Sequence, residues 1–212
     1  MSRGDVESCV DLDVHVDPTD ALVLGVDVAR FGDDESVIWI KRGRDCEGGG
    51  YFRYAGLDTM QLAARINDLA NKLRPDAIFI DGGGVGGGVV DRCRQLNLDV
   101  TEVNFGSKAT QPGYANLRAQ MWGNLREAIK EGVRLPDDAD LISDLTGVEY
   151  GFTNSNLIQL EKKEDMKKRG LKSPDLADAL ALCFVWPVFP SRMGWHNSMS
   201  DQQAQSDYNP YA

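Results

Sequence analysis

The hydrophobic pattern of the chain opens with a continuous apolar run at residues 22–28, which a single acid, Asp27, interrupts. Such a run is typical of a central strand with both faces covered. Two further strands are predicted at residues 36–41 and 51–55, after short polar or glycine-rich turns. Three strands joined in this way form an antiparallel meander.

Helices and strands alternate after the meander. A cap at Thr59, followed by apolar residues at helical spacing, predicts a helix that stops before Pro75, and residues 77–81 predict a short buried strand. Because a helix separates the two strands, this strand should lie parallel to the first. Later elements are predicted as helices at 89–96, 115–131 and 140–145, a strand at 100–103 and a hairpin across 149–160. The pattern predicts an α/β fold whose mixed sheet has the first strand at its centre, the antiparallel strands on one side, parallel strands on the other, and flanking helices.

The last predicted helix follows Ser173, which we expect to cap it, with Pro174 in its first turn. Its residues are apolar almost all round, so the helix should be buried. Asp175 and Asp178 lie three positions apart and share one face. Buried carboxylates require a partner. One interpretation is the helix dipole for Asp175 and an Arg or Lys for Asp178, and the other is a metal ion.

Three acids interrupt apolar runs at elements where burial is expected: Asp27, Asp81 and Asp178. Asp81 ends a strand at the carboxyl edge of the sheet, where open α/β sheets place their sites, and a terminal helix packed across the sheet can bring Asp178 there. Clustered carboxylates bind hard divalent cations, and two such cations ~3.5–4 Å apart orient a water and stabilise a leaving oxygen on phosphorus. Each acid alone is weak evidence for a functional site, since Asp27 can pair with Arg30 and Asp81 is a common strand-end residue. Together they predict a metal site.

Composition narrows the class of protein. A chain of 212 residues suits one domain, which we place at 21–190, with 1–20 as a linker remnant and the polar residues 191–212 as a flexible tail. The net charge of −10 means that attraction of nucleic acid needs a local basic patch or cations. Four cysteines without a C-x-x-C pair and two histidines argue against zinc and disulfides. Without an apolar run of ~18 residues or a signal peptide, we expect a soluble protein of a reducing compartment.

Three segments resemble the signatures of the nuclease domain of large terminase subunits from tailed bacteriophages: 25–34 (GVDVARFGDD), 80–86 (IDGGGVG) and 162–180 (KKEDMKKRGLKSPDLADAL). The resemblance spans about Leu22 to Val188, and the third signature is the most diagnostic. It implies a ribonuclease H-like fold and an endonuclease that cuts concatemeric viral DNA with two Mg²⁺ or Mn²⁺ ions during headful packaging. By the resemblance, Asp27, Asp81 and Asp178 are the metal ligands, and Asp175 either ligates a second ion or caps the helix.

The same resemblance implies double-stranded DNA as substrate, the portal protein and the small terminase subunit as partners, and the host cytoplasm as location. Large terminase subunits also carry an ATPase motor. No G-x-x-x-x-G-K-[ST] motif occurs in this chain, so we expect a nuclease domain without the motor, with residues 1–20 as the remnant of the connection.

A basic segment precedes the last helix, and its cations are Lys162, Lys163, Lys167, Lys168, Arg169 and Lys172. One interpretation is contact with DNA phosphates, which positions DNA without reading its sequence, with one lysine near the scissile bond. The other is a solvated helix with ion pairs between neighbouring turns. The spacing does not select which lysine approaches the DNA.

Other functions fit parts of the sequence. Gly82, Gly84 and Gly87 follow a strand in the G-x-G-x-x-G spacing of dinucleotide-binding modules, with Glu102 about 20 residues on. That interpretation leaves Asp27 and the acids of the last helix unexplained. A non-catalytic portal-docking domain, and a junction resolvase or transposase of the same fold, are the remaining alternatives.

Overall fold

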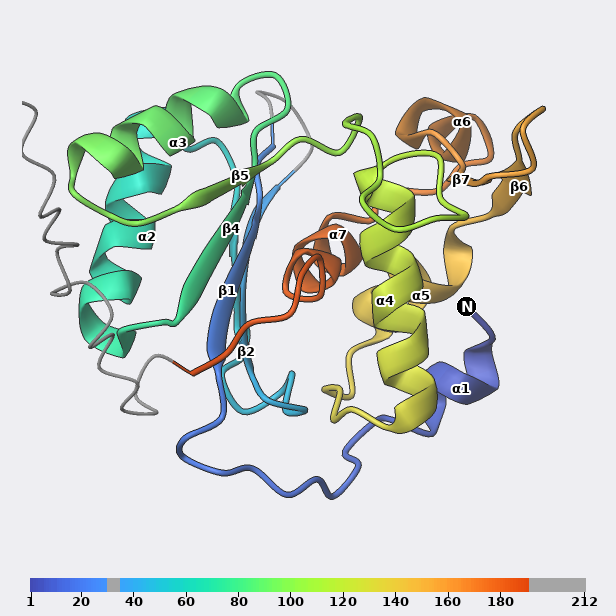
Figure 1. Cartoon of the computed structure of the whole chain (residues 1–212), viewed down its shortest axis with the longest axis horizontal. Helices are drawn as coiled ribbons and strands as arrows, with labels where there is room; N and C mark the ends of the chain where they lie inside the picture. The colour runs from blue at the N-terminus through green and yellow to red at the C-terminus, as the bar shows by residue number, and fades with distance from the viewer. Residues whose placement is uncertain (30–34, 191–212) are drawn as a thin grey trace, which may run out of the picture.

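The protein is described here from a computed structural model, in which residues 1–29 and 35–190 are placed. A five-stranded mixed sheet with the order β3-β2-β1-β4-β5 forms its centre (Figure 1). The strands are β1 (Leu22–Asp27), β2 (Ser36–Arg42), β3 (Tyr51–Tyr54), β4 (Ala77–Asp81) and β5 (Thr101–Val103). β1 pairs antiparallel with β2 and parallel with β4, so the predicted central position of the first strand is confirmed.

Helices cover both faces of this sheet. They are α1 (Arg3–Glu7), α2 (Thr59–Leu73), α3 (Gly86–Gln95), α4 (Leu117–Glu131), α5 (Ala139–Gly147), α6 (Lys163–Lys168) and α7 (Asp175–Leu182). Figure 1 shows α2 and α3 on one face and α7 on the other, with α4 and α5 outside α7. The predicted hairpin is confirmed as β6 (Tyr150–Phe152) and β7 (Ile158–Leu160). No helix among the placed residues is both long and apolar enough to cross a bilayer.

The sheet separates two hydrophobic clusters, and this division positions the acids. Leu24 and Val26 belong to the cluster under α2 and α3, whereas Val23 belongs to the cluster with α4, α5 and α7. Because successive strand residues point to opposite faces, Asp27 lies on the α7 face, as Val23 does. Phe79 is likewise in the α7 cluster, so Asp81 also lies on that face. Two acids of neighbouring parallel strands thus share one face and one edge.

Helix α7 crosses β1 at very short range, and Gly25 makes this approach possible. A Cβ atom at Gly25 would overlap the carbonyl oxygen of Ala179 and would lie 2.8 Å from Cys183 Sγ. The glycine therefore allows a helix backbone to lie directly on the central strand, two residues before Asp27. This close packing brings Asp178 to the strand end.

Two helix caps differ from those predicted. Helix α2 is capped by Asp58, not Thr59, in a reciprocal capping box with Gln61. Helix α7 is not capped by Ser173, because Pro174 takes the cap position and Ser173 Oγ is buried with no hydrogen-bond partner in the described structure. Instead, the Leu176 N–H donates to Asp144 Oδ2 of α5 at 3.2 Å. A cap from a distant helix has no local sequence signal.

The start of the segment 1–20, which the sequence predicts as a linker remnant, packs against the domain. Val6 of α1 and Cys9 are buried in the cluster beneath α4 and α5. The Leu135 N–H donates to the Cys9 carbonyl, which ties the segment to the domain. One buried position in a short helix and one just after it are too few for a periodic signal. All but the last residue of the predicted turn at 30–35, and the whole of the predicted tail at 191–212, lie outside the described residues.

Candidate active site

The end of β1 and the start of α7 enclose a single ammonium group. Lys163 Nζ lies 3.2 Å from Asp27 Oδ2, 3.2 Å from Asp175 Oδ1 and 3.1 Å from Asp178 Oδ2. β1 places Asp27, and the first turn of α7 places both other acids on one face. The structure therefore brings three of the four candidate ligands together around one point.

Asp81 completes the group from the neighbouring strand. Val26 pairs with Ile80 in the parallel register, so Asp27 and Asp81 come next on adjacent strands. The Asp81 carboxylate accepts a hydrogen bond from the Gly83 N–H at 3.0 Å. Burial raises the pKa of Asp81 to about 6, although the Gly83 N–H and the Lys163 charge lower it. The parallel register therefore puts Asp81 on the strand next to Asp27, on the same face of the sheet.

Asp178 is fully buried and is held by three donors besides Lys163. Arg118 donates from Nε to Oδ1 at 3.0 Å and from Nη2 to Oδ2 at 3.1 Å, and Trp122 Nε1 donates to Oδ1 at 2.7 Å. Burial favours the neutral acid, but the Arg118 and Lys163 charges outweigh it and hold the pKa of Asp178 below its usual value. The interpretation that pairs Asp178 with an Arg or Lys is therefore realised in this structure.

At Asp27 the effect of burial on the pKa exceeds that of the neighbouring positive charge, the reverse of Asp178. Burial raises the pKa of Asp27 well above its usual value even though Lys163 lies beside it, and the charge on Asp178 adds to the rise. Its Oδ1 atom is buried and has no hydrogen-bond partner among the described residues. A buried carboxylate oxygen without a donor is costly unless something positive binds it. Among the described residues, this oxygen therefore keeps a free acceptor site.

Lys163 belongs to the basic segment, but its ammonium group contacts the acids, while its side chain remains 32% exposed. The three carboxylates raise the pKa of Lys163 well above its usual value, against the opposing effect of burial. The other cations of the segment are more open: Lys162 and Lys167 are exposed, and Lys168 pairs with Asp165 at 2.6 Å. The structure thus divides the basic segment into one cation inside the site and several outside it.

Sequence reasoning missed Arg118, Trp122 and Asp144. Arg118 and Trp122 are four positions apart on α4, beside inward residues of the predicted apolar face, so helical spacing was an available signal. Asp144 lies on a short predicted helix, and the sequence around it gave no signal of its role. Burial raises the pKa of Asp144 to about 7, and the charges of Asp175 and Asp178 add to the rise while backbone N–H groups at the start of α7 oppose it.

The donor chemistry of the site fits a hard divalent cation. All four candidate ligands are carboxylates, and the unpartnered Asp27 Oδ1 supplies a free acceptor. Within the placed residues, no three His, Cys, Asp or Glu side chains lie close enough to enclose a metal ion as they stand. Lys163 holds the position between the acids, so an ion and this ammonium group compete for the same oxygens.

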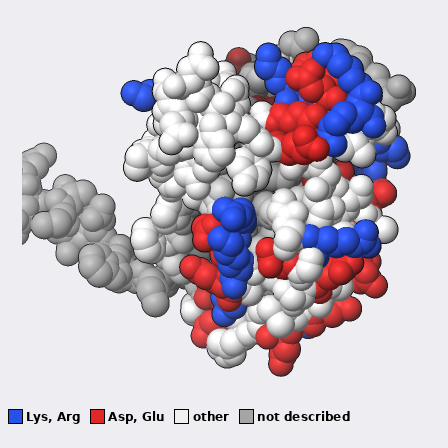
Figure 2. All heavy atoms as spheres, turned by 90° about the vertical axis from the view of Figure 1, so that its right-hand side faces the viewer, with Lys and Arg blue, Asp and Glu red and all other residues white. Residues whose placement is uncertain are grey.

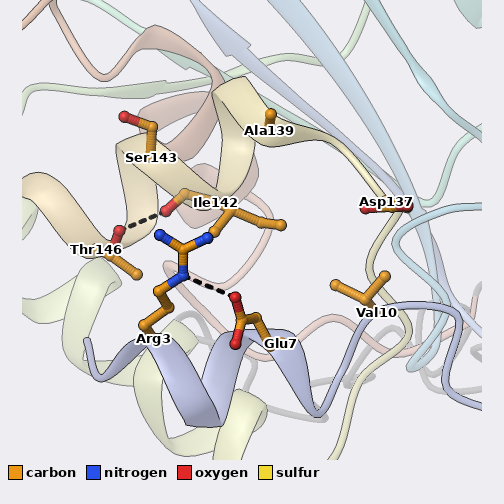
Figure 3. A pocket seen from close by; sticks show the side chains of 8 residues that line it. All are labelled: Arg3, Glu7, Val10, Asp137, Ala139, Ile142, Ser143 and Thr146. Carbon is orange, nitrogen blue, oxygen red and sulfur yellow. Dashed lines mark hydrogen bonds and ion pairs between the residues drawn. The ribbon is translucent and has the colours of Figure 1, made fainter.

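A separate pocket of about 500 Å³ lies between α1 and α5 (Figure 3). Its lining residues are Arg3, Glu7, Val10, Asp137, Ala139, Ile142, Ser143 and Thr146. Arg3 and Glu7 pair with each other at 2.7 Å, and none of the four acids lines the pocket. We therefore place the candidate site at the sheet edge and not in this hollow.

Comparison with known proteins gives matches among solved structures alone, since no family model and no curated protein sequence matches the chain. The nuclease domain of the large terminase subunit gp2 of bacterial virus Sf6 is 22% identical, with a TM-score of 0.73 over 89% of this chain and 99% of that one. The large terminase nuclease of thermophilic phage G20c with bound magnesium is 19% identical, with a TM-score of 0.61 over 80% and 82%. The Thermus phage P74-26 large terminase nuclease domain is 15% identical, with a TM-score of 0.61 over 86% and 93%. The chain therefore has the ribonuclease H-like fold of the nuclease domains of phage large terminase subunits.

Proposed function

We propose that the chain is the nuclease domain of a large terminase subunit, a metal-dependent endonuclease that cleaves concatemeric viral DNA during genome packaging. The observation that carries this proposal is the convergence of Asp27, Asp175 and Asp178 on one point, with Asp81 on the adjacent strand. These acids come from three distant segments of the chain. The fold in which they meet is that of known nuclease domains.

In this proposal Asp27, Asp81 and Asp178 hold two Mg²⁺ or Mn²⁺ ions, with Asp175 as a further ligand. Two such ions, when bound, activate the attacking water and stabilise the leaving oxygen of the phosphodiester. Arg118 and Trp122 keep the Asp178 carboxylate ionised and fixed in orientation. Lys163 neutralises the acids in the metal-free protein. A bound ion would need the same carboxylate oxygens, so Lys163 would have to give them up.

Exposed cations of the basic segment then contact the DNA backbone. Lys162, Lys167, Lys168 and Arg169 lie on or beside α6, next to the Lys163 position in the site. Contacts of this kind neutralise phosphates without reading bases, and they are needed because the chain has a net charge of −10. The portal protein and the small terminase subunit as partners, and the host cytoplasm as location, belong to the proposal and rest on the resemblance.

The glycine-rich turn after β4 favours this proposal over a dinucleotide-binding module. A Cβ at Gly82 would overlap the side chain of Glu102, and one at Gly86 would overlap the Asp81 carbonyl oxygen. The turn is therefore already filled by the chain itself. Asp81 and Glu102 also put two carboxylates where a pyrophosphate would need to approach the α3 N-terminus, which opposes anion binding there.

The test is conversion of supercoiled plasmid to nicked and linear forms at low salt, with Mg²⁺, with Mn²⁺ and with EDTA. Asp81→Asn is the informative variant, because it removes the carboxylate charge while it keeps the size and shape of the side chain, and burial already disfavours the charge at this position. Asp91→Asn, on the exposed face of α3, is the matched control. We expect metal-dependent cutting by wild type and the control and loss of cutting in Asp81→Asn. Intact plasmid with every metal, or equal cutting by Asp81→Asn, refutes the proposal.

A further inference from the structure

The β6–β7 hairpin presents two aromatic rings to solvent. Tyr150 is 65% exposed and Phe152 is 62% exposed, and their rings meet edge to face with centroids 6.1 Å apart. The two residues are two positions apart on β6 and so lie on the same face of the hairpin. Their cross-strand partners Leu160 and Ile158 extend this face, which we call the aromatic hairpin face. Two large rings left in water gain little from folding, which suggests that a ligand covers them.

The hairpin is joined directly to the candidate active site. β7 ends at Leu160, and Lys163, which contacts the acids, follows only three residues later, a span of at most about 10 Å. Arg118 reinforces this connection, because its Nη1 donates to the Glu161 carbonyl at 3.0 Å while its other nitrogens hold Asp178. The hairpin and the acid cluster are therefore linked by a short segment of chain and by Arg118.

The hairpin itself carries no charge, since residues 150–160 contain no charged side chain in a chain with 33 acids. The two acids that flank it, Glu149 and Glu161, both pair with Arg169, at 3.2 Å and 2.5 Å. Figure 2 faces the side of the molecule that carries α6 and the hairpin, and a broad uncharged surface there borders a group of Lys and Arg mixed with Asp and Glu. The exposed Lys162 and Lys167 belong to the adjoining segment. A nucleic acid strand can approach here without the repulsion that the acidic remainder of the surface exerts.

The side chains of the hairpin are suited to bind a DNA strand whose bases are exposed. Aromatic rings stack on any base that has left the duplex, whereas the base faces of an intact duplex are covered by their neighbours. The turn supplies Thr153, Asn154 and Asn156, whose hydroxyl and amide groups can contact phosphate and sugar. A second protein chain would use the rings as a hydrophobic anchor, but the neutral surface beside lysines favours the strand.

We propose that Tyr150 and Phe152 stack on unpaired bases of the DNA substrate beside the cut site. The hairpin thereby gives the domain a preference for locally opened or distorted DNA over intact duplex. This inference rests on the proposed function for its substrate class. It adds a base-stacking subsite, which the acid cluster does not require.

The test measures binding of a short duplex, of the same duplex with a central unpaired bubble, and of a single strand, in EDTA so that metal-dependent cutting does not interfere. A 2-aminopurine in the bubble reports stacking through quenching of its fluorescence. Wild type is expected to bind the bubble more tightly than the duplex and to quench the probe. In the Tyr150→Ala/Phe152→Ala double variant we expect bubble binding to fall by about tenfold or more, with duplex binding little changed and quenching lost.

Three further variants separate stacking from bulk and from damage to the fold. Phe152→Trp should keep the bubble preference and the quenching, whereas Phe152→Leu should lose both, because leucine has similar bulk but no π face. Phe52→Ala removes another exposed ring, 41% exposed, from β3, where Phe52 stacks on Tyr54, and should leave binding unchanged. Equal affinity of wild type for bubble and duplex, no binding by wild type, or retained quenching in the double variant overturns the inference.

The outcomes distinguish this inference from the proposed function. If wild type cuts plasmid while the double variant binds the bubble as wild type does, the hairpin inference fails alone. If wild type cuts nothing with any metal while the double variant loses bubble binding, the nuclease proposal fails and the stacking subsite stands. If the double variant instead converts an oligomer to a monomer without changing DNA binding, the face is a contact between copies of the chain and the inference is overturned.

Discussion

Arg118 and Asp178, 60 residues apart in the chain, form a buried two-point ion pair in which each carboxylate oxygen accepts one guanidinium N–H. Arg118 lies on α4 and Asp178 on α7, so the pair also fixes the packing of these helices. A fork of this kind sets the orientation of the carboxylate as well as its charge. The proposed metal ligand is thus held in place before any metal binds.

We predict that Arg118→Ala lowers the free energy of unfolding by about 3–5 kcal/mol, because it leaves the Asp178 charge buried without its main partner. Urea denaturation measures this loss. The double variant Arg118→Met/Asp178→Asn should recover much of the stability, since neither member of the pair is then charged. Arg53→Ala, which breaks exposed pairs with Glu35 and Asp140, is the control and should cost at most about 1 kcal/mol. Equal losses in Arg118→Ala and Arg53→Ala would show that the buried pair contributes no more to stability than the exposed pairs do.

Gly25→Ala is predicted to displace α7 from β1. The added methyl group would overlap the Ala179 carbonyl, which is backbone and has no room to turn aside. We expect a loss of about 1–3 kcal/mol or more in the free energy of unfolding, together with weaker metal binding, because Asp178 moves with the helix. The control is Gly4→Ala in α1, where nothing lies within 4 Å of the new atom. Unchanged stability and metal affinity in Gly25→Ala would contradict the close packing that we describe.

Asp144 makes stability depend on pH. Its pKa is raised to about 7 from 3.8, so the folded protein binds this proton more tightly than the unfolded chain does. The resulting stabilisation is fully present below pH 3.8 and is lost as the pH rises through about 7. Relative to Asp144→Asn, wild type should therefore lose up to about 4 kcal/mol between acidic and mildly alkaline pH. Denaturation of both proteins across that range in EDTA checks the prediction, and parallel stability curves would refute it.

Lys163→Met should change how the protein responds to metal. Removal of the ammonium group leaves Asp27, Asp175 and Asp178 without the cation that they share, so the metal-free variant should melt at a lower temperature than wild type. Mn²⁺ should raise the Tm of the variant more than that of wild type, because no ammonium group has to be displaced. Lys72→Met, on the exposed side of α2, is the control. An equal or smaller Mn²⁺ shift in Lys163→Met would mean that metal and lysine do not compete.

Much of the sheet could be predicted because its signals are local. Apolar runs with short turns defined β1 to β4, and the order of helices and strands gave the central place of β1. The acids stood out for the same reason, since Asp27, Asp81 and Asp178 each break an apolar run. Residues that act only through tertiary contact could not be found in this way. Asp144 caps a helix 32 residues further along the chain, and no pattern within its own helix reports that.

The basic segment is a second case in which the sequence could not identify the residue that enters the site. Its six cations look alike in the sequence, yet Lys163 enters the acid cluster while Lys168 pairs with Asp165 on the surface of α6. The difference arises from the position of the β6–β7 hairpin, which delivers Lys163 to the sheet edge. Since this placement depends on how the hairpin packs against α4, spacing alone could not identify which lysine reaches the site.

Anomalous difference density from crystals soaked in Mn²⁺ would locate the metal centre directly. We expect a peak among Asp27, Asp81 and Asp178, with carboxylate oxygens at about 2.0–2.3 Å and the Lys163 ammonium group displaced from its present contacts. The same soak of Asp81→Asn should give a weaker peak or none. Absence of a peak in wild type at saturating Mn²⁺, with Lys163 still between the acids, would contradict the assignment of these carboxylates as a metal centre.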